Sequence, residues 1–248
     1  MTVNRARPEV TVLMPVFNGE QYLSKAIESI LCQTFRDFEF LVVDDGSTDR
    51  SMSIARSFRD ERIKILTNGR NMGIVPTLNR GIEAARGRYI ARMDSDDISL
   101  RRRLEKQVTF LEKHPGIGLC GTWIKLKGRS LRRIHRNPVD PDGIKAGLFF
   151  RDIIAHPTVV MRTEWVRRFG LRYDPSFPHA EDWELWQRAS SCFPIANLPE
   201  VLLEYRLNPN GISATKQAEQ METIRRIYRK SLGTLGIEAT DDEIDLHF

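Results

Sequence analysis

Short apolar runs alternate with longer amphipathic stretches along the first half of this 248-residue chain, and the alternation restricts the folds it can adopt. The apolar runs, expected to be buried strands, are residues 10–14, 38–43, 63–66 and 89–93. The amphipathic stretches, expected to be helices, are residues 22–31, 49–58, 75–85 and 100–113. Strands that alternate with helices predict an α/β fold with a doubly wound, mostly parallel central sheet and helices on both faces.

The pattern becomes mixed after Gly118. Strands are expected at residues 117–121, 122–127, 158–161 and 201–205. Helices are expected at residues 163–169, 181–190 and 215–232, and residues 137–143, rich in proline and aspartate, are expected to form a turn. We expect one globular unit over residues 1–214, followed by a C-terminal helix and an acidic tail over residues 215–248.

Acidic residues follow two of the expected strands. Asp94, Asp96 and Asp97 come after the fourth strand, and the segment 44–49 (Asp-Asp-Gly-Ser-Thr-Asp) comes after the second. The carboxyl ends of parallel strands meet at one edge of an open sheet, where ligands bind. Clustered carboxylates repel one another unless a cation lies on them, and hard divalent metals prefer oxygen ligands. The pattern predicts a metal-assisted phosphate site, and capping of the next helix by Thr48 or Asp97 is the alternative for single residues.

Two common phosphate-binding loops are absent from the sequence. Residues 14–20, after the first expected strand, lack the glycine fingerprint of dinucleotide-binding folds, and no GxxxxGK[ST] motif occurs. A metal held by carboxylates is the natural substitute for neutralising a diphosphate.

Charge and composition narrow the class of protein. The net charge of +5 favours anionic partners such as nucleotides, phosphates or acidic lipid surfaces. No apolar run approaches the roughly 20 residues that span a bilayer, and residues 1–8 lack the apolar core of a secretory signal. The three cysteines lack metal-ligand spacing. We expect a cytoplasmic protein.

The chain resembles a known family at five ordered places. These are Pro15-Val16-Phe17-Asn18, Asp44-Asp45-Gly46-Ser47-Thr48-Asp49, Asp94-Ser95-Asp96, His156-Pro157 and Glu181-Asp182. In order and spacing they are similar to the family 2 inverting glycosyltransferases, and the resemblance covers about residues 9–207. It implies the GT-A fold, a donor-binding part at about residues 9–121 and an acceptor-facing part at about residues 122–214.

The resemblance also implies roles for the matching residues. The donor-binding residues would be Pro15, Val16, Phe17, Asn18 and Glu20 along the base and ribose, Asp45 on the base, typically uracil, and Asp94 near the ribose. Asp96 would ligate Mg²⁺ or Mn²⁺ at the donor diphosphate, and Asp182 would be the catalytic base. Transfer with inversion does need a base on the side of the anomeric carbon opposite the leaving group.

Two secondary candidates lie beside Asp182. Glu181 shares the start of the same expected helix, where the helix dipole alone favours acidic residues. Trp183 could stack on an acceptor sugar, but its spacing from Trp186 favours a place in the core.

Two more secondary candidates are basic. His156 could contact a phosphate or the acceptor, and the alternative is a structural histidine. Arg206 belongs, with Ser213, to a late segment that approaches the diphosphate in some members of the family.

Residues 125–136 carry most of the excess positive charge. The default interpretation is a solvated hairpin. The alternative is contact with anionic lipid headgroups at the inner face of the membrane, aided by the last helix with Met221, Ile224, Ile227 and Tyr228 near one face. Docking of that helix on its own domain would explain the apolar face equally well.

The sequence thus predicts a metal-dependent inverting glycosyltransferase of polysaccharide or lipid-linked glycan synthesis. Its partners would be a nucleotide-sugar donor, a UDP-sugar first, and a saccharide or lipid-linked saccharide acceptor, without nucleic acid. The alternatives are a nucleotidyltransferase acting on sugar phosphates and a non-catalytic sugar-nucleotide-binding protein.

Overall fold

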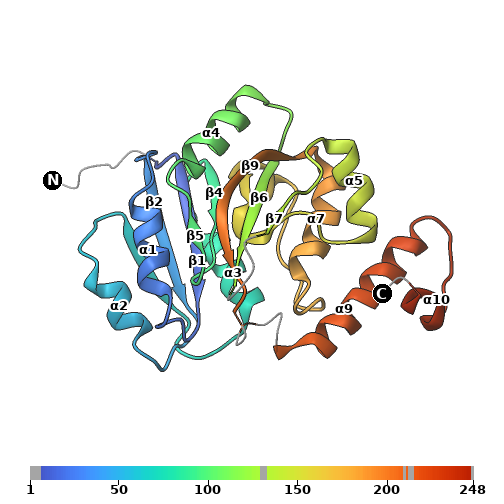
Figure 1. Cartoon of the computed structure of the whole chain (residues 1–248), viewed down its shortest axis with the longest axis horizontal. Helices are drawn as coiled ribbons and strands as arrows, with labels where there is room; N and C mark the ends of the chain where they lie inside the picture. The colour runs from blue at the N-terminus through green and yellow to red at the C-terminus, as the bar shows by residue number, and fades with distance from the viewer. Residues whose placement is uncertain (1–6, 129–132, 209–210, 212–214, 247–248) are drawn as a thin grey trace.

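The computed structural model describes residues 7–128, 133–208, 211 and 215–246, and one mixed sheet of nine strands crosses this part of the chain (Figure 1). Its first half is parallel, in the order β3-β2-β1-β4. The strands are β1 (Val10–Val16), β2 (Phe38–Asp44), β3 (Ile63–Thr67) and β4 (Tyr89–Arg92). The helices between them are α1 (Leu23–Leu31), α2 (Ser51–Ser57) and α3 (Ile74–Ala84). The predicted doubly wound start of the fold is confirmed.

Helices cover both faces of this half of the sheet. Side chains alternate along a strand, so Val12 and Met14 of β1 pack on one face, with α1, α2 and α4 (Arg103–Lys113). Leu13, between them, packs on the opposite face with α3. A parallel sheet buried on both faces needs apolar residues at every position, which is why its strands read as unbroken apolar runs.

Strands from later in the chain extend the same sheet in the order β4-β8-β6-β9-β5. They are β5 (Ile98–Ser99), β6 (Leu119–Lys127), β8 (Val160–Arg162) and β9 (Ile195–Arg206). β8 runs antiparallel to β4 and β6, whereas β6 and β9 are parallel. β7 (Ile134–His135) pairs with β6 as the predicted hairpin. The expected mixed C-terminal part is therefore continuous with the parallel part.

Two strands in the second half of the chain differ from the prediction. Residues 119–127 form one strand, β6, where two were expected at residues 117–121 and 122–127. β9 was expected only at residues 201–205 but covers residues 195–206. The strand accommodates Pro199 and Glu200 by a register shift, so that Leu198 pairs with Thr122 and Val201 pairs with Trp123.

Two helices were missed in the sequence. α5 (Pro141–Phe150) begins inside the predicted turn, because Asp140 caps it by accepting from the Gly143 N–H at 2.7 Å. α10 (Asp241–Asp245), in the expected acidic tail, starts with a capping box between Thr240 and Glu243. Asp140 and Thr240, expected from the sequence to lie in a turn and in an acidic tail, are the N-cap residues of these two helices.

The remaining helices form the far side of the molecule. They are α6 (Thr163–Arg168), α7 (Glu181–Cys192) and α9 (Gln217–Gly233), with a 3₁₀ turn, η1 (His156–Thr158), before β8. In α9, Ile227 and Tyr228 are buried, and Lys230 reaches the buried Glu184 of α7 at 2.7 Å. The apolar face of α9 is therefore docked on its own domain (Figure 1). Among the described residues, no helix has the length and apolar character to cross a membrane.

Candidate active site

The two acidic segments lie on either side of the carboxyl end of β1, as the topology predicted. β1 lies between β2 and β4, and the Asp45 N–H donates to the Val16 carbonyl at 2.8 Å. On the other side, the Met93 N–H donates to the Leu13 carbonyl at 3.0 Å. Residues 45 and 94–97 therefore leave the sheet on either side of the loop that follows β1.

Hydrogen bonds join the loop after β1 to the loop after β2. Asn18 has a positive φ of 48°, its N–H donates to the Ser47 hydroxyl at 3.0 Å, and its side-chain oxygen accepts from the Thr48 N–H at 2.9 Å. The expectation that Thr48 caps α2 is wrong, since the residue preceding that helix is Arg50, with no side-chain cap.

The predicted donor-binding residues of the first loop differ in exposure. Pro15 and Val16 are buried within β1, and Val16 belongs to the apolar core beneath α1. Phe17 is 47% exposed, and Asn18 is also exposed. Glu20 pairs with Arg50 at 3.1 Å. Phe17 and Asn18 are therefore the side chains of this loop that are open to a ligand.

Asp45 is buried and organises the loop before α3. Its Oδ1 accepts from the Asn68 side chain and from the Met72 N–H, both at 2.8 Å. Its Oδ2 accepts from the Gly73 N–H at 2.9 Å. A carboxylate has about four acceptor sites, so one stays open on Oδ2.

The second acidic segment forms a compact triad of carboxylates. One oxygen from each of Asp94, Asp96 and Asp97 lies within 4.8 Å of the others. Burial and the neighbouring Asp94 raise the pKa of Asp96, and burial with both neighbours raises the pKa of Asp97 well above its ordinary value. The alternative that Asp97 caps a helix is wrong, because β5 follows it and α4 begins only at Arg103.

The end of β9 holds this triad in place. The Arg206 N–H donates to Asp97 Oδ1 at 2.7 Å, and its Nε donates to the Asp96 carbonyl at 2.8 Å. The Asn208 side chain donates to Asp96 Oδ2 at 3.1 Å. Arg206 thus supports the acidic segment. Ser213, its companion in the sequence-based hypothesis, lies outside the described residues.

The triad fits a divalent cation. Asp97 Oδ2 is buried and has no hydrogen-bond partner among the described residues. Three clustered carboxylates, one with an unsatisfied oxygen, form the hard oxygen donor set that Mg²⁺ and Mn²⁺ bind.

A second acidic group lies in the first turn of α7. Asp182 Oδ1 accepts from the Trp183 N–H at 2.9 Å, and Oδ2 lies 3.4 Å from His156 Nδ1. Burial raises the pKa of Asp182. Burial and the adjacent Asp182 raise the pKa of Glu181 to about 7.

Arg92, which no sequence argument singled out, links the two acidic groups electrostatically. It is 4% exposed at the end of β4, and its Nη1 lies 2.5 Å from Asp94 Oδ2. Its charge also acts on Asp182 and on Asp97, lowering the pKa of each against the effect of burial. The signal available in the sequence was a cation inside an apolar strand, which needs a buried acidic partner.

Two secondary candidates are buried. Trp183 is 3% exposed, donates from its indole nitrogen to the Leu148 carbonyl at 2.6 Å and packs edge-on against Tyr228. It therefore belongs to the core, the reading that its spacing favoured. His156 is 8% exposed, and its ring nitrogens face Tyr173 and Asp182.

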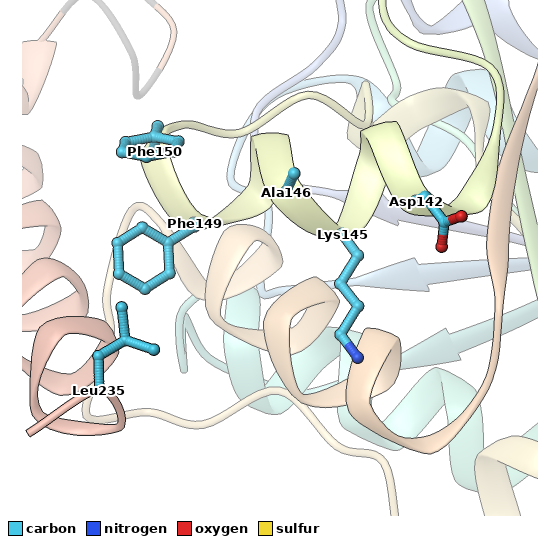
Figure 2. Close-up of a pocket in the computed structure, with 6 residues that line it drawn as sticks. All are labelled: Asp142, Lys145, Ala146, Phe149, Phe150 and Leu235. Carbon is cyan, nitrogen blue, oxygen red and sulfur yellow. The ribbon is translucent and has the colours of Figure 1, made fainter.

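A separate hollow of about 430 Å³ lies beside α5 and shares no residue with either acidic group. Figure 2 shows Phe149 and Phe150 of α5 facing Leu235, from the turn after α9, across it. No titratable cluster lines this hollow, so the chemistry of the chain points to the acidic edge of the sheet.

Known proteins resemble this chain in sequence. Residues 11–170 match the sequence model described as Glycosyl transferase family 2. An uncharacterized glycosyltransferase of Haemophilus influenzae is 35% identical over 237 residues, covering 91% of this chain and 73% of the relative. The Escherichia coli protein WfgD, named UDP-Glc:alpha-D-GlcNAc-diphosphoundecaprenol beta-1,3-glucosyltransferase, is 32% identical and covers 85% of this chain and 81% of its own.

Solved structures share the fold. TarS 1–349 of S. aureus, in complex with UDP-GlcNAc, has a TM-score of 0.76 at 20% identity, covering 96% of this chain and 70% of that one. The mannosyltransferase PcManGT of Pyrobaculum calidifontis, in complex with GDP-Man and Mn²⁺, has a TM-score of 0.70 at 19% identity. The match covers 92% of this chain and 65% of that one. These likenesses support the predicted GT-A-type α/β fold.

Proposed function

Since the chain belongs to glycosyl transferase family 2, and is therefore a glycosyltransferase, we propose that it transfers a sugar from a UDP-sugar to a hydroxyl acceptor with inversion and with a divalent metal. The observation that carries the proposal is the pair of acidic groups around Arg92. The triad ion-pairs with this arginine through Asp94, and Asp182 interacts with the same charge from another element.

The triad would hold the metal, with Asp96 as the first ligand and Asp94 and Asp97 beside it. A bound divalent cation would screen the charge that develops on the departing diphosphate. Arg206 and Asn208 keep the acidic segment in position from the end of β9. Residues 9–121 would form the donor-binding part, in which Phe17, Asn18 and the open acceptor site of Asp45 face the nucleoside.

Asp182 would remove the proton from the acceptor hydroxyl. Its side chain is 20% exposed, so the carboxylate is open to a substrate while the rest of the first turn of α7 is buried. Residues 122–214, which contribute α7, would form the acceptor-facing part. General-base catalysis contributes typically about 10²–10⁴ in rate.

The names of relatives support a substrate class. WfgD is named for UDP-Glc and a diphosphoundecaprenol-linked sugar, and the AmsE protein of Erwinia amylovora is named for amylovoran biosynthesis. We propose that this chain acts in polysaccharide or lipid-linked glycan synthesis, on a saccharide or lipid-linked saccharide acceptor.

Membrane contact through residues 125–136 is the less favoured part of the proposal. Lys125 and Lys127 both pair with Glu204, at 3.2 and 3.1 Å, so part of this charge is neutralised within the domain. Co-sedimentation with vesicles that contain an anionic lipid tests the contact. Absence of salt-sensitive binding would reject it.

The test of the reaction uses two variants and a control. Asp182→Asn should bind UDP like the wild type but turn over less than about a hundredth as fast, because the base is lost. Asp96→Ala should lose Mn²⁺-dependent UDP binding. The exposed Asp142→Asn, on α5, is the matched control and should retain both properties. Wild-type turnover in Asp182→Asn, or release of pyrophosphate in place of UDP, would contradict the proposal.

A further inference from the structure

The carboxylate of Asp182 has a backbone donor on one oxygen and the His156 ring near the other, and the Asp152 side chain hydrogen-bonds to it as well. The Trp183 N–H binds Oδ1 at 2.9 Å, and the His156 ring faces Oδ2 through Nδ1 at 3.4 Å. The backbone donor is fixed by α7. The orientation of the carboxylate therefore depends on where the His156 ring is held and on which ring nitrogen carries the proton.

The backbone of His156 is fixed by the buried polar residues of α4. Arg103 donates from Nη1 to the Pro157 carbonyl at 2.6 Å, and Gln107 donates to the Thr158 carbonyl at 2.7 Å. Both side chains are fully buried. Side chains of α4 therefore hold the 3₁₀ turn that carries His156 at two successive carbonyls, those of Pro157 and Thr158.

Tyr173 is fixed equally firmly on the other side of the ring. The Asn79 side chain of α3 accepts from the Tyr173 N–H and donates to its carbonyl, both at 2.9 Å. The tyrosine is 2% exposed, and its hydroxyl lies 2.7 Å from His156 Nε2. Trp186 packs edge-on against the His156 ring, with 5.7 Å between ring centroids. The ring is therefore held from three directions.

Electrostatics decides the direction of these contacts. Burial and the charge of Arg92 lower the pKa of His156 well below its ordinary value, so the ring is neutral and carries one proton. If Nε2 held that proton, a bare Nδ1 would face a carboxylate, lone pair against anion. If Tyr173 donates its O–H to Nε2, the proton lies on Nδ1, the ring nitrogen that is 3.4 Å from Asp182 Oδ2.

We propose that Tyr173 and His156 are positioning residues that present an Nδ1–H to Asp182 and hold its carboxylate in one orientation for proton abstraction. The inference rests on the proposed role of Asp182 as the base. It adds a chain of polar groups, from Tyr173 through His156 to Asp182. This chain connects α7 with η1 and with the segment between α6 and α7, which carries Tyr173.

Several charged or titratable groups act on Asp182 and enter any pH dependence. They are Arg92, Asp94, Asp152, Glu181, His156 and Tyr173. Among them, the His156 ring lies 3.4 Å from the Asp182 carboxylate through Nδ1, and the Asp152 side chain also hydrogen-bonds to Asp182. Loss of the Nδ1–H should raise the pKa of Asp182 and move the acid limb of the rate profile to higher pH.

The tautomer of His156 can be read directly by NMR. In ¹⁵N-histidine-labelled protein, the His156 signals, assigned by their loss in His156→Asn, should show protonated Nδ1 and bare Nε2 near neutral pH. In Tyr173→Phe the population of the Nε2–H form should increase. A wild-type ring protonated on Nε2, or an unchanged tautomer in Tyr173→Phe, would overturn the proposal.

Kinetics supply the second readout. Tyr173→Phe should lower kcat about threefold to tenfold, as expected for one hydrogen bond, with the donor KM unchanged. His156→Asn, whose amide can replace the Nδ1–H, should retain more activity than His156→Ala. Tyr228→Phe is the matched control, since Tyr228 is also buried but its hydroxyl donates to the Phe150 carbonyl, and this variant should keep the wild-type pH profile.

The two readouts separate two kinds of failure. If the tautomer is as expected but no nucleotide sugar is turned over, the proposed function fails and the polar chain stands. If turnover is found and Tyr173→Phe has the rate and the pH profile of Tyr228→Phe, the positioning role is wrong.

Discussion

Replacement of Gly46 by alanine should damage the loop that wraps Asp45. Gly46 has a φ of +75°, and an added Cβ would lie 2.4 Å from the carbonyl carbon of Arg70 and 2.7 Å from the nitrogen of Asn71. Gly69, in the loop between β3 and α3, has the same φ of +75°, but an added Cβ there would have nothing within 4 Å. The two glycines therefore share the backbone strain and differ in the clash.

The expected losses of stability follow from the backbone strain and from the steric clash. A left-handed φ costs alanine about 1–2 kcal/mol, so Gly69→Ala should lower the free energy of unfolding by about that amount. Gly46→Ala adds a clash with main-chain atoms, which cannot rotate away, and overpacking of this kind costs about 1–3 kcal/mol more. In a chain of this size each kcal/mol corresponds to about 2–4 °C in Tm.

Urea denaturation and UDP calorimetry measure the two consequences. Gly46→Ala should be the less stable variant, and it should bind UDP more weakly, because displacement of residues 70–73 removes the Met72 and Gly73 donors from Asp45. Gly69→Ala should bind UDP like the wild type. Equal losses of stability in the two variants would refute the steric argument.

Three further predictions concern charge. Burial raises the folded-state pKa of Glu181 to about 7 from 4.5, so the stability that neutral Glu181 provides below about pH 4.5 is lost as the pH rises through 7. By urea denaturation, Glu181→Gln should be more stable than the wild type at pH 8 by up to about 3 kcal/mol, and the two should not differ at pH 4. Arg206→Met should weaken Mn²⁺ activation about tenfold in a metal titration, because the hydrogen bond from Arg206 Nε to the Asp96 carbonyl is lost and groups that hold metal ligands in place matter at about that level. An unchanged titration would count against the supporting role of Arg206. Arg92→Met should move the acid limb of the pH–rate profile to higher pH, because the cation that favours ionised Asp182 is lost, and Arg92→Lys should move it less. If Arg92→Met and the wild type have the same pH–rate profile, the charge of Arg92 does not act on Asp182.

The first half of the fold was predictable because a parallel sheet covered on both faces leaves continuous apolar runs in the sequence. The placement of Asp45 and residues 94–97 on either side of the end of β1 followed from topology alone, since β2 and β4 flank β1 and parallel strands end at one edge. The second half was harder to predict. Asp140 and Pro141 serve equally well in a turn and at a helix start, and only the packing of Ile144 and Leu148 decides for α5.

Sequence patterns suggested candidate site residues but did not give their partners. Thr48 resembles a cap in the sequence, but Asn18, 30 residues away, accepts its N–H. Arg92 has no motif around it, although its partner Asp94 is only two residues away. Tyr173 has no motif either, and only folding brings it to His156.

The central claim is a single displacement, with the base of α7 acting on the face of the sugar opposite the diphosphate. With water as the acceptor, ¹H NMR during slow hydrolysis of an α-linked UDP-sugar by the Mn²⁺-loaded protein reports the first anomer formed. The account predicts that the β-anomer appears first and that Asp182→Asn abolishes its formation. First appearance of the α-anomer would contradict it.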